Sequence, residues 1–214
     1  MGAAAPVPPV TAQPLLAGET RTGTLEDFSG TVFVGGSAMA GLAGYVKARR
    51  GEDASFMPGA QFVAVPGLTV EGALAAHGAG AGLAASLAGT GAQRILMMLP
   101  VDDFGAAQAA LPNVRVLLHQ MKESCPDAQL CVLSCPPERG AAAEDNGAIL
   151  RYNMGLWGLC LQYGLCFIDT ASALRDGQGA LAQAYCMDAQ AGGAYLSAAG
   201  CEALLQYLSA HVPL

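Results

Sequence analysis

The stretch TVFVGGSAMAGL, residues 31–42, joins an apolar run to a pair of glycines and a serine. The β-branched run 31–35 is typical of a buried strand that ends at glycine, and residues 38–49 are expected to form the following helix. Ser37 therefore lies at a strand-to-helix turn, near the positive end of the helix dipole. Such a serine serves either as a nucleophile or as an ordinary helix N-cap, and this stretch alone leaves both readings open.

The alternation of short apolar strands and helices continues along the chain. Further strands are expected at 61–66, 94–99, 129–134 and 165–169, and helices at 69–87, 113–124, 146–163 and about 197–210. Short strands that are uniformly apolar and separated by helices are typical of a parallel sheet covered on both faces. The pattern predicts a three-layer α/β/α sandwich with a five-stranded parallel sheet. In such sheets function lies in the loops after the carboxyl ends of the strands.

The length and net charge of the chain exclude some classes of function. The 214 residues suffice for one domain, expected at 26–214, and the Ala/Pro-rich start, 1–25, is typical of a linker. A net charge of −7 argues against nucleic acid as a partner. No apolar stretch reaches the ~18 residues of a membrane-spanning helix. We expect an extracytoplasmic or cell-surface location if a leader was removed, and a cytoplasmic one otherwise.

The cysteines and histidines give no sign of a metal centre. There are seven cysteines, so at least one thiol is unpaired, and most lie in apolar runs typical of small buried hydrophobes. Neither residue type clusters at zinc-like spacing, and no metal or cofactor is expected. A mechanism that needs a histidine base would have to use His77, His119 or His211.

Five segments together resemble the blocks of the SGNH (GDSL-like) hydrolases. They occur in the family's order across about residues 27–211, and each follows an expected strand or lies before the last helix. The segments are TVFVGGSAMAGL, VPGLTV, ILMMLPVDDFG, NMGLWGLCLQYGLCFIDTASAL and AYLSAAG. The resemblance implies the flavodoxin-like SGNH hydrolase fold and a serine ester hydrolase, such as a lipase, esterase or acetylhydrolase, as the starting point for function.

The first two blocks keep part of the family's machinery. The resemblance places the nucleophile at Ser37, which also contributes to the oxyanion hole, and puts Gly36 where the family's GDS motif has Asp. It assigns Gly67 as a backbone N–H donor of the oxyanion hole. Gly36 is also expected among the residues that contact the substrate.

The remaining blocks depart from the family at polar positions. Asp102 stands where the family has the Asn side chain of the oxyanion hole, and Asp103 beside it is expected to contact substrate. In the last block, Tyr195 stands where the family has its catalytic His and Gly192 where it has Asp. Asp188 is the nearest upstream acid, and we treat it as a displaced acid of the triad.

These departures weaken hydrolysis in physical terms. Removing the base from a serine triad costs about a million-fold in turnover, and tyrosine is a poor base at neutral pH because its reference pKa is near 10. A carboxylate at Asp102 opposes the negative charge that develops in the transition state. Each of the three histidines is expected down a helix, in a surface or packing role.

We therefore expect a catalytically impaired or inactive SGNH-like protein. Its pocket would lie around Ser37, Gly67, Asp102 and Tyr195, and would bind a small molecule or a carbohydrate, such as a glycan or an acylated glycan. One alternative is an active serine esterase or acetyl hydrolase in which Asp188, Asp102 or Tyr195 supplies a rearranged base. Another is a structural or interaction domain of a surface protein, favoured by the Pro-rich start.

Overall fold

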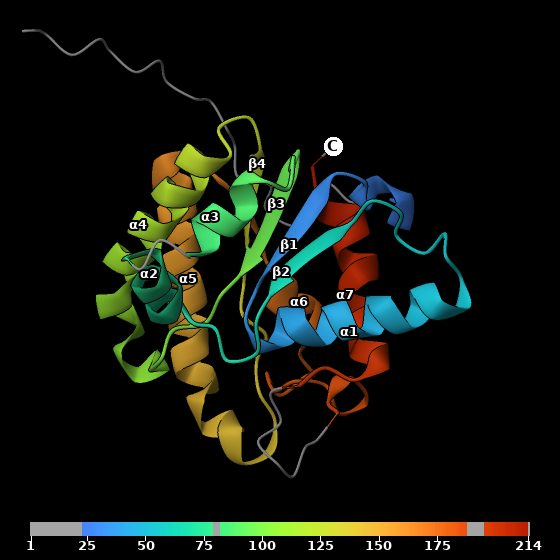
Figure 1. Cartoon of the computed structure of the whole chain (residues 1–214). Coiled ribbons are helices and arrows are strands. Elements are labelled where there is room, and N and C mark those ends of the chain that lie inside the picture. The colour runs from blue at the N-terminus through green and yellow to red at the C-terminus, as the bar shows by residue number, and fades with distance from the viewer. Residues whose placement is uncertain (1–22, 79–81, 188–194, 214) are drawn as a thin grey trace, which may run out of the picture.

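The computed structural model describes residues 23–78, 82–187 and 195–213, and it contains a central five-stranded sheet (Figure 1). All strand pairs are parallel, in the order β2-β1-β3-β4-β5. This is the flavodoxin-like order, in which the sequence of strands across the sheet changes direction between β1 and β3. The strands are β1 Thr31–Gly35, β2 Gln61–Ala64, β3 Arg94–Met98, β4 Gln129–Leu133 and β5 Cys166–Ile168.

Helices cover both faces of the sheet, which makes the predicted three-layer sandwich (Figure 1). The helices α2 to α5 pack together on one face, and α1, α6 and α7 lie on the other. The helices are α1 Ser37–Glu52, α2 Val70–Gly78, α3 Leu83–Ala88, α4 Ala107–Ser124, α5 Asn146–Tyr163, α6 Thr170–Leu174 and α7 Ala198–His211. Short 3-10 helices occupy η1 Leu25–Phe28, η2 Phe104–Ala106, η3 Gly140–Asp145 and η4 Gln183–Tyr185.

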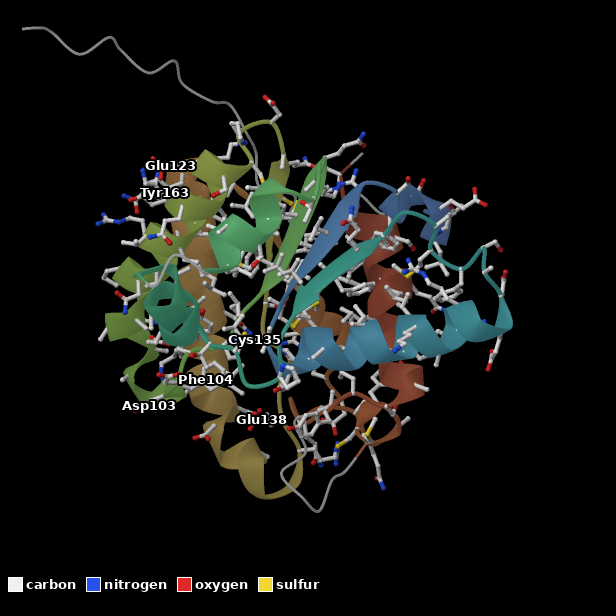
Figure 2. All side chains as sticks on the ribbon, viewed as in Figure 1. Asp103, Phe104, Glu123, Cys135, Glu138 and Tyr163 are labelled. Carbon is white, nitrogen blue, oxygen red and sulfur yellow. The ribbon has the colours of Figure 1, made fainter. Side chains whose placement is uncertain are left out.

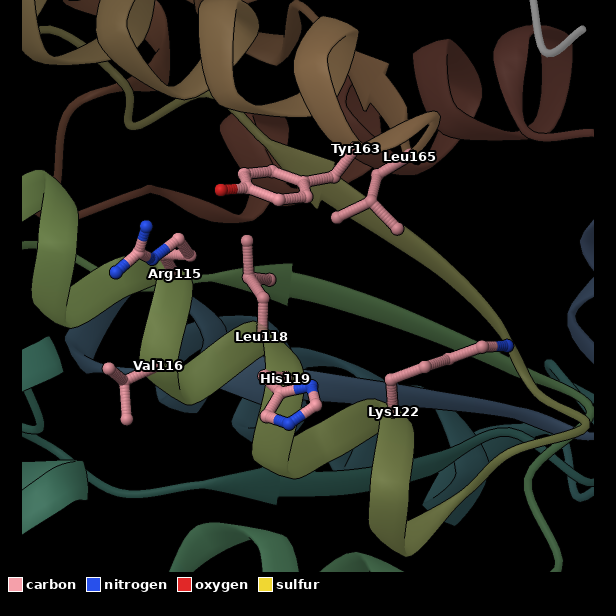
Figure 3. A pocket seen from close by; sticks show the side chains of 7 residues that line it. All are labelled: Arg115, Val116, Leu118, His119, Lys122, Tyr163 and Leu165. Atoms are coloured by element: carbon pink, nitrogen blue, oxygen red, sulfur yellow. The ribbon is translucent and has the colours of Figure 1, made fainter. Parts of the chain in front are cut away.

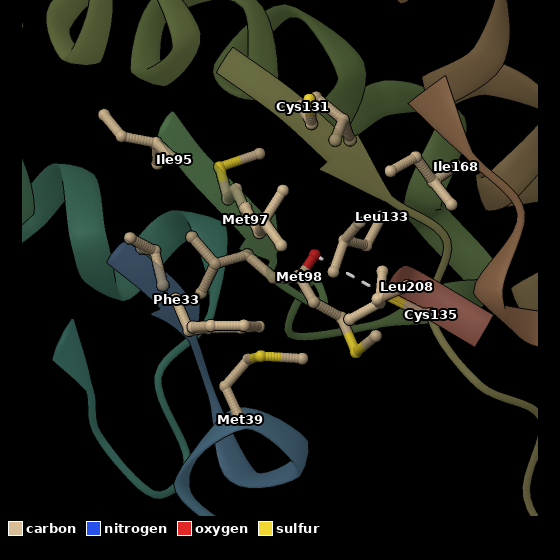
Figure 4. Close-up of a cluster of buried hydrophobic side chains, with 14 of the residues drawn as sticks. Phe33, Met39, Ile95, Met97, Met98, Cys131, Leu133, Cys135, Ile168 and Leu208 are labelled. Carbon is tan, nitrogen blue, oxygen red and sulfur yellow. Dashed lines mark hydrogen bonds between the residues drawn. The ribbon is translucent and has the colours of Figure 1, made fainter. Parts of the chain in front are cut away.

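The core forms because β1 has apolar side chains on both of its faces. All five of its residues are buried, as expected for a central strand of a parallel sheet. Phe33 stacks on Phe62 of the neighbouring strand at a centroid distance of 4.9 Å and meets Phe28 edge-on at 5.4 Å. Figure 4 shows Phe33 beside Met97 and Met39 in this cluster. The dense packing fixes where β1 ends, and so fixes the start of α1.

Three expectations about helices were wrong in detail. The Ala-rich run 69–87 is not one helix, because α2 ends at Gly78 and α3 begins only at Leu83. The α4 helix begins at Ala107 rather than at 113, and it runs through Pro112, whose ring is exposed to solvent. The apolar pattern of 146–163 also predicts that Trp157 lies in the core, but its side chain keeps 37% of its surface exposed on α5. The predicted boundaries 146–163 are confirmed, and Ser197 caps α7 by accepting a hydrogen bond from the Gly200 N–H at 3.2 Å.

The cysteines behave mostly as packing residues. All seven are free thiols, and four are buried: Cys131, Cys135, Cys160 and Cys201. Across the described ranges, no helix has both the length and the apolar character that crossing a membrane requires. Most of the segment expected as a linker, residues 1–22, lies outside the described residues, and Leu25 of its end packs against the core.

Candidate functional site

Ser37 is the first residue of α1 and lies directly after β1, where the sheet presents its carboxyl ends. Its hydroxyl oxygen accepts a hydrogen bond from the Gly67 N–H at 3.0 Å. Gly67 adopts a φ of +74°, a conformation that side chains other than glycine rarely take. The structure thus brings together two residues that the sequence placed at one site. In this bond the hydroxyl oxygen of Ser37 is the acceptor, so the Gly67 N–H does not remove the hydroxyl proton.

The Asp102 carboxylate is held by the neighbouring loop. The Thr69 hydroxyl donates to its Oδ1 at 2.5 Å, and the Thr69 oxygen accepts from the Gly72 N–H at 3.2 Å. The Asp102 N–H donates in turn to the Glu71 carboxylate at 3.2 Å. These bonds tie the loop after β3 to the start of α2. Asp102 is exposed, and it is not among the residues that line the cavity beside Ser37.

Two further polar positions from the sequence, Asp103 and Tyr195, are not among the residues that line the cavity beside Ser37. The Asp103 carboxylate caps η2 by accepting from the Gly105 N–H at 2.7 Å. Tyr195 is 51% exposed, and its carbonyl accepts from the Met187 N–H at 2.9 Å. Asp188 and Gly192 lie outside the described residues. Their predicted roles in substrate binding and in the triad therefore stay predictions.

A small cavity of about 160 Å³ lies beside Ser37. Its walls come from the loops that follow β1, β3 and β4, at the lower end of the molecule in Figure 2. Among the described residues, the lining is mostly apolar and one charged side chain reaches it. The lining residues are Gly36, Ser37, Ala38, Met98, Pro100, Phe104, Cys135, Pro136 and Glu138.

The charged residue of the cavity is Glu138, which the sequence analysis missed. Its side chain is half-buried, and burial raises the pKa of its carboxyl group, with a further contribution from the negative charge of Asp145. A polar residue in the loop after a strand was the available signal. It was overlooked because Pro136 and Pro137 come directly before it, and prolines after a strand indicate no more than a loop.

Two asparagines of α5 hold the loop that carries Glu138. Asn153 accepts from the Cys135 N–H and donates to the Cys135 carbonyl, both at 2.8 Å. Two helical turns earlier, Asn146 accepts from the Glu138 N–H at 2.7 Å and donates to the Glu138 carbonyl at 2.9 Å. The neighbouring Tyr152 hydroxyl donates to the Leu99 carbonyl at 3.0 Å. The cavity wall is therefore fixed by side chains that bond to backbone groups.

Cys135, His119 and His211 are unsuited to catalysis at this cavity. Burial raises the pKa of the Cys135 thiol to about 12, which keeps it in the unreactive thiol form. Figure 4 shows Cys135 among core side chains. His119 pairs with Glu123 at 3.4 Å on exposed α4, and His211 stacks on Tyr207 at the end of α7. Neither histidine lines the cavity, and the side chain of His77 lies outside the described residues.

Comparison with known proteins gives structural likeness without sequence matches. No family model matches the chain, and no curated protein matches it. A Streptococcus pneumonia protein provisionally named a platelet activating factor is similar at a TM-score of 0.64 and 21% identity, covering 84% of this chain and 82% of its own. A GDSL-like lipase from Bacteroides thetaiotaomicron gives 0.60 and 12%, covering 86% and 88%.

A third similar structure is the periplasmic domain of a lipopolysaccharide acetyltransferase from Salmonella Paratyphi A. Its TM-score is 0.58 at 14% identity, and the match covers 89% of this chain and 84% of that one. At these identities the likeness concerns the fold. The roles of individual residues rest on the geometry described above.

Proposed function

Because this chain has the fold of the SGNH (GDSL-like) hydrolases, we propose that it binds a short acyl group on a small molecule or carbohydrate without turning it over efficiently. The observation that carries the proposal is the partner of the Ser37 hydroxyl. That partner is the Gly67 N–H, a donor, at 3.0 Å. A serine hydroxyl becomes an effective nucleophile when an adjacent base accepts its proton. A donated hydrogen bond does not supply that step.

The dimensions of the cavity favour a compact group. Its volume of about 160 Å³ is small beside the roughly 300–1,000 Å³ of pockets that enclose drug-sized ligands. Apolar walls from Met98, Phe104 and Pro136 suit the methyl end of an acetyl or similar group. The rest of the ligand, such as a glycan, would lie outside the cavity. A glycan or an acylated glycan is the kind of ligand expected from the sequence.

The Asp102 carboxylate supports impaired catalysis. Thr69 and Glu71 hold Asp102 in the loop after β3, and the family resemblance assigns an oxyanion donor to this position. A negative charge there disfavours the oxyanion that ester hydrolysis must form, and losing one donor alone costs about 10²–10³ in turnover. Binding of the neutral ester in its ground state is affected much less.

The first test compares the protein with its Ser37→Ala variant. We expect hydrolysis of p-nitrophenyl acetate by the two proteins to differ by less than about tenfold, since no side chain in the described part of the chain accepts a hydrogen bond from the Ser37 hydroxyl. A fluorophosphonate probe is expected to label neither. Stoichiometric labelling that disappears in Ser37→Ala would contradict the proposal. Calorimetric titration with an O-acetylated sugar and its deacetylated form then checks that binding depends on the acyl group.

A second candidate function is ester hydrolysis with Glu138 as the base. The specific observation in its favour is that Glu138 and Ser37 line the same cavity, and that burial raises the pKa of the Glu138 carboxyl group. A carboxylate with a raised pKa is a stronger base than an ordinary one. Activity of this kind would rise as the pH increases through the raised pKa, because the deprotonated form takes up the proton.

The Glu138→Gln variant distinguishes this candidate. If Glu138 is the base, turnover of p-nitrophenyl acetate is expected to fall at least about tenfold, and the rise with pH is expected to disappear. The matched control is Glu123→Gln, which removes an exposed carboxylate on α4 that does not line the cavity. Equal rates and equal pH profiles for Glu138→Gln and the unmodified protein would exclude Glu138 as the base.

A further inference from the structure

A second and larger cavity lies far from Ser37. Its volume is about 530 Å³, within the range of ligand pockets. It lies between α4 and the segment that leaves α5 for β5. In Figure 2, Tyr163 and Glu123 mark this region at the opposite end of the molecule from Glu138. The lining residues are Arg115, Val116, Leu118, His119, Lys122, Tyr163 and Leu165.

The middle of this groove is apolar and its ends are basic. Leu118 is 5% exposed and forms the floor, and Leu165 lies across from it beside the Tyr163 ring (Figure 3). Arg115 lies at the same end as the Tyr163 hydroxyl, and Lys122 extends toward the other end (Figure 3). An apolar channel with a cation at its end matches a ligand that has an alkyl chain and a negatively charged head.

The basic side chains of the groove differ in whether they already have polar partners. The Lys122 ammonium donates to the Ala128 carbonyl at 2.9 Å, and His119 faces the Glu123 carboxylate at 3.4 Å. For Arg115, the described residues supply neither a hydrogen-bond nor an ion-pair partner. Its guanidinium offers a fork of donors that fits a carboxylate. In a chain with a net charge of −7, this exposed cation beside an apolar floor is available to an anionic ligand.

A neighbouring cavity strengthens the assignment of the head group. It measures about 320 Å³ and shares Arg115 and Tyr163 with the larger one. Its other lining residues are Gln108, Leu111, Pro112, Leu159 and Gln162. Arg115 and Tyr163 therefore stand where the two cavities meet. A carboxylate at that junction is reached by the guanidinium and by the phenol, while the alkyl chain follows the larger groove.

We propose that the groove between α4 and the end of α5 binds a single-chain fatty carboxylate. Its carboxylate accepts hydrogen bonds from Arg115 and the Tyr163 hydroxyl, and its alkyl chain covers Leu118 and Leu165. A single alkyl chain needs no hydrogen-bond partners along its length, and the floor of the groove offers none. An extended acidic peptide would leave backbone groups unpaired on that floor.

The test titrates the protein with dodecanoate below its micelle concentration, by calorimetry. We expect Arg115→Gln to bind dodecanoate roughly tenfold more weakly, because it loses a charge-assisted contact. Binding of dodecanol, which has no charge, is expected to be unchanged by the same substitution. Arg151→Gln is the matched control, because it removes the same charge from an exposed position on α5 that does not line the groove. Its affinity is expected to equal that of the unmodified protein.

Two outcomes would overturn the proposal. Equal dodecanoate affinities for Arg115→Gln, Arg151→Gln and the unmodified protein would show that the head group is not recognised by Arg115. The second outcome comes from sedimentation of the protein and of a variant at the exposed residue Val116. If the protein is a dimer that Val116→Asp separates, and dodecanoate does not bind, a second copy of the chain covers the groove instead.

Discussion

Replacing Asn153 with alanine is expected to lower the free energy of unfolding by about 3 kcal/mol. The Asn153 side chain is 7% exposed, and it satisfies both the N–H and the carbonyl of Cys135 at 2.8 Å. Cys135 follows the end of β4, so these two backbone groups lie beyond the sheet's own ladder. The substitution leaves a buried donor and a buried acceptor unpaired, each at a cost of roughly 1–3 kcal/mol.

The control for this prediction is Asn146→Ala. Asn146 makes the same pair of bonds to the backbone of Glu138, but there the bonds are only partly buried. Water can replace the lost side chain, so we expect a loss of about 1 kcal/mol. Urea unfolding followed by the fluorescence of Trp157, the single tryptophan, measures both variants. If Asn153→Ala lowers the free energy of unfolding no more than Asn146→Ala does, burial of the two hydrogen bonds does not determine how much they stabilise the protein.

Restoring the family's aspartate by Gly36→Asp is expected to destabilise the protein by about 3 kcal/mol. A Cβ at Gly36 would lie 2.4 Å from the Leu68 carbonyl oxygen and 3.3 Å from the Pro100 ring. The first of these atoms belongs to the backbone, so a rotamer change cannot relieve the contact. The loop that carries Gly67 would have to move, and the hydrogen bond to Ser37 with it. At the size of this chain the loss corresponds to a decrease of roughly 6–12 °C in Tm.

The same change at Gly41 serves as the control for Gly36→Asp. Gly41 is exposed on the same helix, and nothing lies within 4 Å of a Cβ built there. We expect Gly41→Asp to change the free energy of unfolding by less than about 0.5 kcal/mol, because aspartate and glycine are both weak helix formers. Thermal unfolding of the two variants side by side makes the measurement. Equal Tm values would mean that the loop after β2 yields readily to a side chain at Gly36.

Local patterns in the sequence were sufficient for the sheet and for most of the helices. The strand 31–35 and the helix 146–163 match β1 and α5, because an unbroken apolar run and a long periodic segment each have one stable arrangement. The run 69–87 was harder, since alanine favours helix without marking where one helix ends. The helix expected at 113–124 begins six residues earlier, at Ala107, because α4 continues through Pro112.

The site was predictable only where it depends on strand ends. Ser37 and Gly67 follow neighbouring strands, so parallel pairing alone brings them close enough for the observed hydrogen bond. The position of Glu138 depends on burial by loops distant in sequence, and the two asparagines that hold it lie on a later helix. Contacts of this kind are tertiary, and no spacing along the chain signals them. The partner of Asp102, Thr69, was missed for the same reason.

The attachment of the loop after β4 to α5 has a consequence for how the molecule opens. Loops commonly fluctuate independently of the elements that they connect, with local opening free energies near zero. Here the backbone groups of Cys135 and Glu138 are bonded to side chains of a helix that packs on the sheet. Exposing this wall of the cavity therefore requires these hydrogen bonds to α5 to break first. We expect the amide hydrogens of Cys135 and Glu138 to exchange with solvent more slowly than those of a loop without such bonds.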